Sequence, residues 1–267
     1  MSIKVCVAGA TGWTGKAVAS AVLASSDFHL VGAIARRQAG IDIGEALGQE
    51  KVGLPIVSSL EEALATPIDV LIDYTGHDSV KERILAALDK GIRVVVGTSG
   101  LANLDYEEIE RSALEHKLGV IAAGNFSITA ALAKHFALIA AQYLPSWEII
   151  DYASASKVDA PSGTTRELAE TLATVAKNKL AVPLEQTHGP KEARGATIDG
   201  TQVHSIRLPS YMIAFETIFG LPNERLSIRH DAGAGAEPYV AGTLLATQKV
   251  MEVNGLVRGL DQLLFHA

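Results

Sequence analysis

Short apolar runs alternate with amphipathic stretches in the first half of the chain. The apolar runs are rich in branched residues and predict strands, and the helical periodicity between them predicts helices. Strands are expected at residues 3–8, 29–35, 69–74, 93–96 and 120–123, with helices at 15–25, 78–90 and 105–117 and a short one after Ser59. Gly91 and Gly119 are expected to end the two later helices. Continuous apolar strands between such helices predict a parallel sheet covered on both faces, in a doubly wound, Rossmann-like α/β fold.

The pattern changes after Gly124, where the predicted strands are longer and follow one another more closely. They cover residues 147–154, 201–208, 211–219 and 226–230, and only a helix at 162–179 interrupts them. This order predicts a second, α+β domain with a mixed or antiparallel sheet. Helices are also expected at 128–144, 238–253 and 257–265, the last two returning to the first domain. We therefore divide the chain into residues 1–124, completed by 236–267, and residues 125–235.

A glycine-rich turn, Gly9-Ala10-Thr11-Gly12-Trp13-Thr14-Gly15, joins the first strand to the first helix. Glycines allow a tight turn and let a pyrophosphate approach the backbone, and the helix start supplies N–H groups and a positive dipole. A plain strand–helix turn is the alternative. Because a strand precedes the turn, a helix follows it and a second strand comes at the right distance, we favour a dinucleotide site.

The end of the second predicted strand bears on which dinucleotide binds. An NAD site usually has Asp or Glu there, but this chain has Arg36 and Arg37 and no carboxylate until Asp42. Two guanidinium groups suit a 2′-phosphate, so we predict NADPH as the preferred cofactor, with NADH possible. The alternative is a solvated basic turn.

The segment Lys157-Val-Asp-Ala-Pro-Ser-Gly-Thr164 leads into the helix at 162–179. Exposed N–H groups at a helix start, small residues and a nearby ammonium group together make a carboxylate site. An ordinary N-cap at Ser162 or Thr164 is the alternative. The segment predicts a small anionic substrate.

Composition excludes several other functions. The net charge of −7 argues against nucleic-acid binding, and no apolar run approaches the ~18–20 residues that cross a bilayer. Met-Ser-Ile-Lys leads directly into a strand, so we expect no secretory signal. The single cysteine, Cys6, suits a reducing cytosol, and a cytoplasmic location is expected. No His, Cys, Asp and Glu cluster has the spacing of metal ligands, so no metal is predicted.

Taken together, these segments resemble the dihydrodipicolinate reductase (4-hydroxy-tetrahydrodipicolinate reductase) family of lysine (diaminopimelate) biosynthesis. The resemblance runs nearly end to end and is carried by residues 8–15, 71–75, 96–100, 124–127, 148–151, 157–164 and 224–230. It implies reduction of a cyclic, unsaturated dicarboxylate by NAD(P)H. It also implies that the first domain binds the dinucleotide, that the second binds the substrate and builds a homotetramer, and that a hinge closes one on the other.

The resemblance also implies roles for individual residues. Lys157 would be the catalytic proton donor, although a surface lysine paired with Asp159 is the alternative. The implied cofactor contacts are Gly9, Ala10, Thr11, Gly12, Trp13 and Thr14 at the pyrophosphate, Arg36 and Arg37 at the adenosine end, and Gly97, Thr98, Ser99, Ala123, Gly124, Asn125 and Phe126 beside the nicotinamide. The implied substrate contacts are Ser154, Ser162, Gly163 and Thr164.

The chain departs from the family pattern at the expected acid/base. Ala153 and Ser154 stand where the family usually has two histidines, and Ile213-Ala214-Phe215 replaces a Gly-Glu-His segment. A family arginine falls within Gly233-Ala-Gly-Ala-Glu237. We therefore expect weak or altered activity. His204, His230 and Tyr152 are the candidates to replace the missing imidazole, each weakly supported because a strand histidine is more often structural.

Other enzyme classes share parts of this pattern. Semialdehyde and acyl-phosphate reductases need a cysteine late in the first domain, and Cys6 lies before the glycine turn, which excludes them. Short-chain dehydrogenases use Tyr-x-x-x-Lys, and Tyr152 and Lys157 are one residue too far apart. An imine reductase or amine dehydrogenase remains open, as does an NADPH-binding sensor without catalytic activity.

Overall fold

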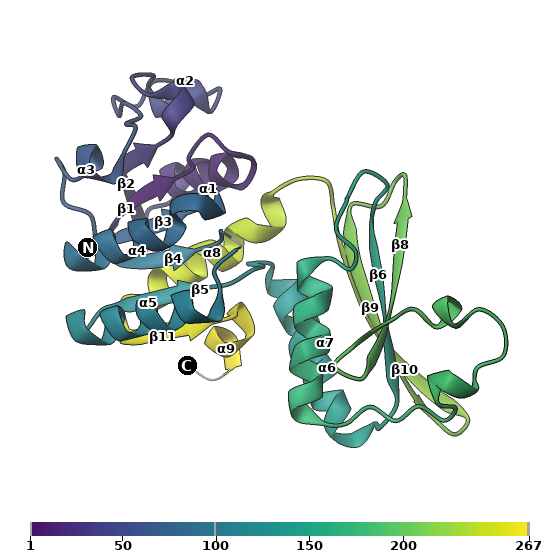
Figure 1. Cartoon of the computed structure of the whole chain (residues 1–267). Coiled ribbons are helices and arrows are strands. Elements are labelled where there is room, and N and C mark those ends of the chain that lie inside the picture. Colours follow the sequence, from purple (N-terminus) through teal and green to yellow (C-terminus); the bar gives the residue numbers. More distant parts are fainter. Residues whose placement is uncertain (1, 99, 266–267) are drawn as a thin grey trace. The chain divides into compact units, whose positions relative to one another are not determined.

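The computed structural model describes residues 2–98 and 100–265, except for the side chain of His77. The chain forms two compact units (Figure 1). One unit comprises Met1–Ile128 with Ala236–Ala267, and the other comprises Thr129–Gly235. The C-terminal segment therefore belongs to the first unit.

The first unit contains a six-stranded parallel sheet in the order β11-β5-β4-β3-β1-β2. Its strands are β1 (Ile3–Ala8), β2 (Phe28–Ile34), β3 (Val70–Asp73), β4 (Arg93–Val96), β5 (Gly119–Ala122) and β11 (Gly255–Arg258). Its helices and 3₁₀ turns are α1 (Trp13–Ala24), η1 (Arg36–Gln38), α2 (Ile43–Ala46), α3 (Leu60–Ala63), η2 (His77–Ser79), α4 (Val80–Asp89), α5 (Asn103–His116), α8 (Glu237–Lys249) and α9 (Leu260–Phe265), with α6 (Ile128–Tyr143) beginning at the unit boundary. The predicted doubly wound fold is confirmed.

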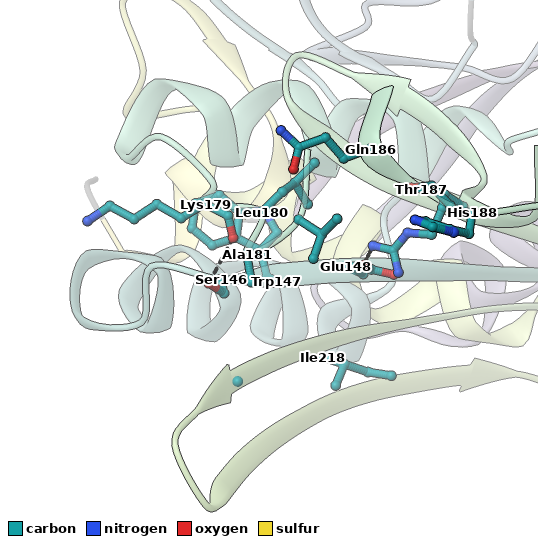
Figure 2. Close-up of a pocket in the computed structure, with 13 residues that line it drawn as sticks. Ser146, Trp147, Glu148, Lys179, Leu180, Ala181, Gln186, Thr187, His188 and Ile218 are labelled. Carbon is teal, nitrogen blue, oxygen red and sulfur yellow. Dashed lines mark hydrogen bonds and ion pairs between the residues drawn. The ribbon is translucent and has the colours of Figure 1, made fainter. Parts of the chain in front are cut away.

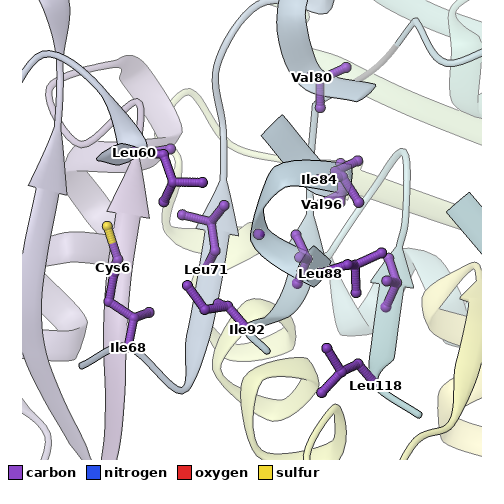
Figure 3. Close-up of a cluster of buried hydrophobic side chains, with 14 of the residues drawn as sticks. Cys6, Leu60, Ile68, Leu71, Val80, Ile84, Leu88, Ile92, Val96 and Leu118 are labelled. Atoms are coloured by element: carbon purple, nitrogen blue, oxygen red, sulfur yellow. The ribbon is translucent and has the colours of Figure 1, made fainter. Parts of the chain in front are cut away.

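The main core of this unit lies between the sheet and the α3, α4 and α5 side (Figure 3). Side chains from strands, such as Leu71, meet side chains from helices, such as Ile84 and Leu88, and all three are fully buried. Helix α1 packs beside α8. Cys6 belongs to the same core, and burial raises the pKa of its thiol to about 12. It is therefore protonated near neutral pH and is no nucleophile.

Two predictions about secondary structure in the first unit are wrong. Residues 257 and 258, predicted as helix, belong to strand β11, which pairs with β5, and α9 begins only at Leu260. A four-residue edge strand is too short for a recognisable sequence pattern, so β11 forms because it pairs with β5. Helix α5 ends at His116 because Lys117 adopts the left-handed conformation at φ 57°, and Gly119 is instead the first residue of β5.

The second unit contains a five-stranded mixed sheet in the order β10-β9-β6-β8-β7. Its strands are β6 (Trp147–Ser154), β7 (Ala196–Ile198), β8 (Thr201–Leu208), β9 (Ile213–Leu221) and β10 (Glu224–Ala232), and its helical elements are α7 (Gly163–Val175), η3 (Leu184–Gln186) and η4 (Lys191–Arg194). Strand β6 is parallel to β8 and antiparallel to β9. The predicted mixed sheet is confirmed, but β7 was missed.

Helices α6 and α7 cover one face of this sheet. Alanines of α6 and leucines of α7 pack against Trp147, Ile149, Phe215 and Phe219, which point to that face of β6 and β9. Small alanine side chains let α6 approach closely, and the large side chains of the strands fill the space between. The start of α7 is thereby fixed relative to β6.

Candidate active site

The glycine turn of the first unit has the geometry of a phosphate-binding loop. Gly9 adopts φ +80°, and a Cβ atom there would lie 2.4 Å from the Tyr74 carbonyl oxygen. A Cβ on Gly15 would lie 2.0 Å from the Gly9 carbonyl oxygen. Helix α1 starts after Gly12 with no side-chain cap and no acidic residue in its first turn. Its positive end is thus not neutralised from within the helix.

A cavity of about 520 Å³ connects this turn with the end of β2. Gly9, Thr11 and Gly12 line it together with Arg36 and Arg37. The residues that sequence reasoning missed here are Ser58, Thr75, Ser79 and Arg83, which also line the cavity. Their signal was weak because they come from loops, from η2 and from α4, outside the glycine motif. The two predicted ends of a dinucleotide site therefore share one cavity.

Arg83, which lines this cavity, forms a buried ion pair with Asp73. Asp73, fully buried at the end of β3, accepts a hydrogen bond from Arg83 Nε to Oδ2 at 2.6 Å. Its Oδ1 accepts bonds from Thr75 N at 2.9 Å and Thr98 Oγ1 at 2.9 Å. Arg83 also donates to the hydroxyl groups of Thr75 and Ser79. The ion pair fixes the loops that follow β3 and β4.

The residues predicted beside the nicotinamide have varied surroundings. A Cβ on Gly97 would lie 2.0 Å from the Tyr74 ring, so this position cannot accept a larger residue without rearrangement. Ala123 and Phe126 are buried, and the Phe126 ring meets Tyr74 edge-on at 6.2 Å. Asn125 Oδ1 accepts a bond from Ser127 N at 2.8 Å, and Gly124 is exposed. Ser99 lies outside the described residues.

Three further cofactor predictions lie on the glycine turn. Ala10 is fully buried, Thr14 is half-buried in the first turn of α1, and Trp13 is 60% exposed. The Trp13 ring meets Tyr239 of α8 edge-on at 5.7 Å.

In the second unit, the turn at residues 157–164 is anchored on a buried carboxylate. Asp151 of β6 is fully buried and accepts bonds from Ser162 N at 3.0 Å, from the Ser162 hydroxyl and from Thr165 Oγ1 at 2.9 Å. Burial alone would raise the pKa of Asp151, but the bonds from Ser162 and Arg207 outweigh it, so that the pKa is lowered. Asp151 therefore stays ionised and holds the first turn of α7.

The predicted substrate contacts divide into two kinds at this turn. Ser162 is buried and both of its polar groups bind Asp151, whereas Gly163 is exposed and an added Cβ there would meet no atom within 4 Å. Thr164, half-buried, follows in the first turn of α7. Ser154 is half-buried and hydrogen-bonded to Ser156 at 3.0 Å between hydroxyl oxygens. Open backbone suitable for a carboxylate is thus at Gly163.

Lys157 forms the ion pair that was the alternative to a catalytic role. Its Nζ lies 2.8 Å from Asp159 Oδ1, and its side chain is 31% exposed. The ion pair lowers the pKa of Asp159. A partly exposed ammonium group next to the start of α7 is compatible with both roles.

The three candidates for the missing imidazole are all engaged elsewhere. His204 Nε2 lies 2.7 Å from Glu148 Oε2, in the first half of β6 and away from Lys157. His230 is buried beside Phe215, its Nε2 lies 3.1 Å from Thr129 Oγ1, and burial lowers its pKa. Tyr152 donates to Glu216 at 3.1 Å, and burial raises its pKa. Each of these groups has a structural partner.

A second cavity, of about 640 Å³, lies at the other end of β6 (Figure 2). Its lining includes Ser146, Glu148, His188 and Ile218, and none of the residues predicted for the site. Arg194 and His204 both bind Glu148 there. This cavity is thus separate from the turn at 157–164.

Within residues 2–98 and 100–265, no group of three His, Cys, Asp or Glu side chains could hold a metal ion. In the same part of the chain, no helix is long and apolar enough to cross a membrane.

Two family models match the chain end to end. One, described as dihydrodipicolinate reductase, N-terminus, matches residues 3–126, and the other, described as dihydrodipicolinate reductase, C-terminus, matches residues 126–264. This chain belongs to the dihydrodipicolinate reductase family. The family assignment from the sequence is confirmed.

Individual members of the dihydrodipicolinate reductase family are similar to this chain along nearly their whole length. The 4-hydroxy-tetrahydrodipicolinate reductase of Desulfitobacterium hafniense is 40% identical over 270 residues, and that of Moorella thermoacetica is 36% identical over 264 residues, each with 98% coverage of both chains. The dipicolinate-bound dihydrodipicolinate reductase of Paenisporosarcina sp. TG-14 superposes with a TM-score of 0.85 at 32% identity, covering 98% of this chain and 99% of its own.

A more distant likeness concerns the fold alone. An amine dehydrogenase from Mycobacterium smegmatis superposes with a TM-score of 0.69 at 15% identity over 98% of this chain and 96% of its own. At this identity the likeness says nothing of chemistry. The architecture of the dihydrodipicolinate reductase family is thus shared with other dehydrogenases.

Proposed function

We propose that this chain is a 4-hydroxy-tetrahydrodipicolinate reductase that transfers hydride from NADPH to a cyclic, unsaturated dicarboxylate. Family membership over nearly the whole chain supports this reaction class. The observation that carries the proposal is the segment 157–164, in which a partly exposed ammonium group and the open start of α7 lie on one anchored loop. A negatively charged substrate with a proton demand fits that combination.

The first unit suits a bound dinucleotide. NADPH, when bound, supplies the hydride. The chain's own contribution is the glycine turn, where the absence of side chains at Gly9 and Gly15 lets the turn pack closely on the backbone around it, and the positive end of α1. Arg36 and Arg37 line the same cavity, which supports a preference for NADPH because two cations can bind a 2′-phosphate.

The second unit would bind and protonate the substrate. Backbone N–H groups at Gly163 and Thr164 would donate hydrogen bonds to one substrate carboxylate, and Ser162 would position them through Asp151. Lys157 would leave Asp159 or share it, and donate a proton to the reduced ring. Hydride addition leaves negative charge on a conjugated imine, which a nearby ammonium group stabilises.

The absent histidines bear on the rate of this reaction. Ala153 is fully buried and has no proton to give, and Ser154 is a weak substitute for a substrate-binding imidazole. We expect lower activity on this substrate than in family members with both histidines, or preference for a related acid.

Turnover of the dihydrodipicolinate precursor, followed by NADPH oxidation, tests the reaction. Lys157→Ala should lower kcat by roughly 10²–10⁴-fold, the usual contribution of a general acid. Lys177→Ala, which removes an exposed lysine of the same unit, should leave kcat unchanged. If kcat survives in Lys157→Ala, Lys157 is not the proton donor.

Cofactor preference is tested separately. Replacing Arg36 and Arg37 with alanine should raise the KM for NADPH far more than the KM for NADH, because only NADPH carries the 2′-phosphate. Equal changes in the two KM values would refute the preference.

A second candidate function follows from the replaced histidine pair. The chain could bind NADPH and act on another small imino or keto acid, as an imine reductase or amine dehydrogenase would, or act as a sensor with no turnover. A panel of cyclic and linear imino and keto acids distinguishes these. Binding of NADPH in calorimetry without its oxidation by any acid in the panel would favour the sensor.

The assembly we propose is a homotetramer built by the second unit. Several apolar side chains of its strands and loops are more than a third exposed, namely Leu208, Met212, Leu221 and Leu226. Exposed apolar side chains of this kind are typical of subunit interfaces. Light scattering of the purified protein tests the subunit number. We also propose a cytoplasmic location, which fractionation of cells would check.

A further inference from the structure

The open start of α7 lies above a buried negative charge. Asp151 accepts the Ser162 N–H at 3.0 Å, and Gly163 follows at once, so the Gly163 N–H is within about 7 Å of Asp151 Oδ2 when one residue spacing of ~3.8 Å is added. A carboxylate bound to that N–H would lie on the order of 10 Å from Asp151 at most. Two negative charges at that separation repel enough to weaken binding roughly tenfold at a protein surface.

Arg207 of β8 supplies the compensating positive charge. Its Nη2 donates to Asp151 Oδ2 at 2.7 Å, and its side chain is only 16% exposed. Asp151 lies beside Ser205 in the pairing of β6 with β8, and Ala153 lies beside Arg207. In the strand register, Arg207 is therefore the neighbour of the position where the family usually has its histidine.

Arg207 also ties the loop that carries Lys157 to the sheet. The same Nη2 atom donates to the backbone carbonyl oxygen of Asp159 at 2.6 Å, while Asp159 itself pairs with Lys157. Both hydrogens of this nitrogen are thus used, one on the strand and one on the loop. Charges alternate along the row Lys157, Asp159, Arg207 and Asp151, and their sum is zero at neutral pH.

We propose that Arg207 is a positioning residue for the substrate carboxylate, because it cancels the charge of Asp151 beneath the α7 turn and fixes the Lys157 loop above it. This inference rests on the proposed function, since it concerns the same anion site. Without Arg207, the remaining charges of Lys157, Asp159 and Asp151 sum to a net negative charge, which repels an incoming carboxylate. Without the Asp151 carboxylate, the turn before α7 would lose its anchor, but the negative charge that repels an anion there would also be gone.

Calorimetry with dipicolinate, in the presence of NADPH, tests the charge argument directly. Arg207→Met should weaken dipicolinate binding about tenfold or more, whereas Arg207→Lys, which keeps the charge, should retain most of the affinity. The double variant Asp151→Asn, Arg207→Met should bind more tightly than Arg207→Met alone, because the uncompensated charge is gone. Arg111→Met, an exposed arginine of the first unit, controls for the loss of one positive charge.

The outcomes separate this inference from the proposed function. Dipicolinate affinity within twofold of the wild type in folded Arg207→Met, or equal losses in Arg207→Met and Arg207→Lys, would overturn the charge role of Arg207. Circular dichroism establishes that each variant is folded, and the double variant provides the comparison where Arg207→Met is unstable. Failure of the wild type to oxidise NADPH with the dihydrodipicolinate precursor, while dipicolinate binding still depends on Arg207, would refute the proposed reaction and leave the inference standing.

Discussion

Each unit of the molecule contains a fully buried aspartate paired with an arginine, but the two ion pairs stabilise different parts of their units. Asp73 and Arg83 brace the loops after β3 and β4, while the turn that we propose binds the dinucleotide is built by glycines after β1. Asp151 and Arg207 lie directly under the first turn of α7. In the first unit the ion pair is therefore separate from the proposed anion site, whereas in the second unit it lies at the proposed anion site.

The turns before α1 and α7 also differ in what fixes their conformation. The turn before α1 needs glycine, since side chains at Gly9 or Gly15 would overlap backbone atoms. The turn before α7 is fixed by side chains, through Ser162, Thr165 and Asp151, and its glycine has open space around it. The conformation of the first turn thus depends on the absence of side chains, and that of the second on side-chain hydrogen bonds.

Breaking the ion pair of the first unit should give the largest effect on stability. Arg83→Met leaves the buried Asp73 carboxylate without its cation and should lower the free energy of unfolding by about 3–5 kcal/mol. Urea unfolding measures the change, with Arg111→Met as the control. Dipicolinate binding, which we propose depends on the other ion pair, should persist in the folded fraction. A loss below about 1 kcal/mol would show that Arg83 is dispensable as a brace.

Substituting one glycine in each turn tests the contrast between them. Gly15→Ala places Cβ against the Gly9 carbonyl and should destabilise the protein by about 1–3 kcal/mol and weaken NADPH binding. Gly163→Ala is the matched variant and should change stability by less than about 1 kcal/mol. Thermal unfolding and NADPH titration measure both. Equal losses in the two variants would contradict the contrast.

Removing the Ser162 hydroxyl group at the start of α7 should have a moderate effect. Ser162→Ala deletes a hydroxyl group that binds Asp151 and should lower the free energy of unfolding by about 0.5–1.5 kcal/mol, with weaker dipicolinate binding. Ser156→Ala, which deletes an exposed hydroxyl group of the same loop, provides the control in the same urea titration. A Ser162→Ala protein as stable as the control would show that Asp151 holds the turn without it.

Mild acid should produce the smallest effect, through His230 in the second unit. Burial lowers its pKa in the folded protein below the usual 6.5, so the unfolded chain takes up the proton first as pH falls. The contribution of neutral His230 to stability is therefore complete above pH ~6.5 and is lost as pH falls through the folded-state pKa. His230→Asn should flatten the pH dependence of the melting temperature below pH ~6.5. An unchanged slope would contradict it.

Much of the architecture could be read from local patterns. Strands β1, β4, β6 and β8 have the predicted bounds, because each is a continuous apolar or alternating run with clear limits. Strands β7 and β11 were missed, since three or four residues carry no period and only their partners β8 and β5 define them. Short edge elements depend on tertiary contacts.

The site divides along the same line. The sequence alone determined the family, the two-unit α/β and α+β organisation, the glycine turn, the arginines at the end of β2 and the segment 157–164, because each is a run of neighbouring residues whose chemistry depends on spacing along the chain. Only the tertiary structure decided that Arg83 braces Asp73 and that Arg207 neutralises Asp151. Arg207 lies 56 residues from Asp151 in the sequence, and the pairing of β6 with β8 brings their side chains together. An ion pair between neighbouring strands gives no periodic pattern in the sequence, because the register of the sheet decides which side chains meet.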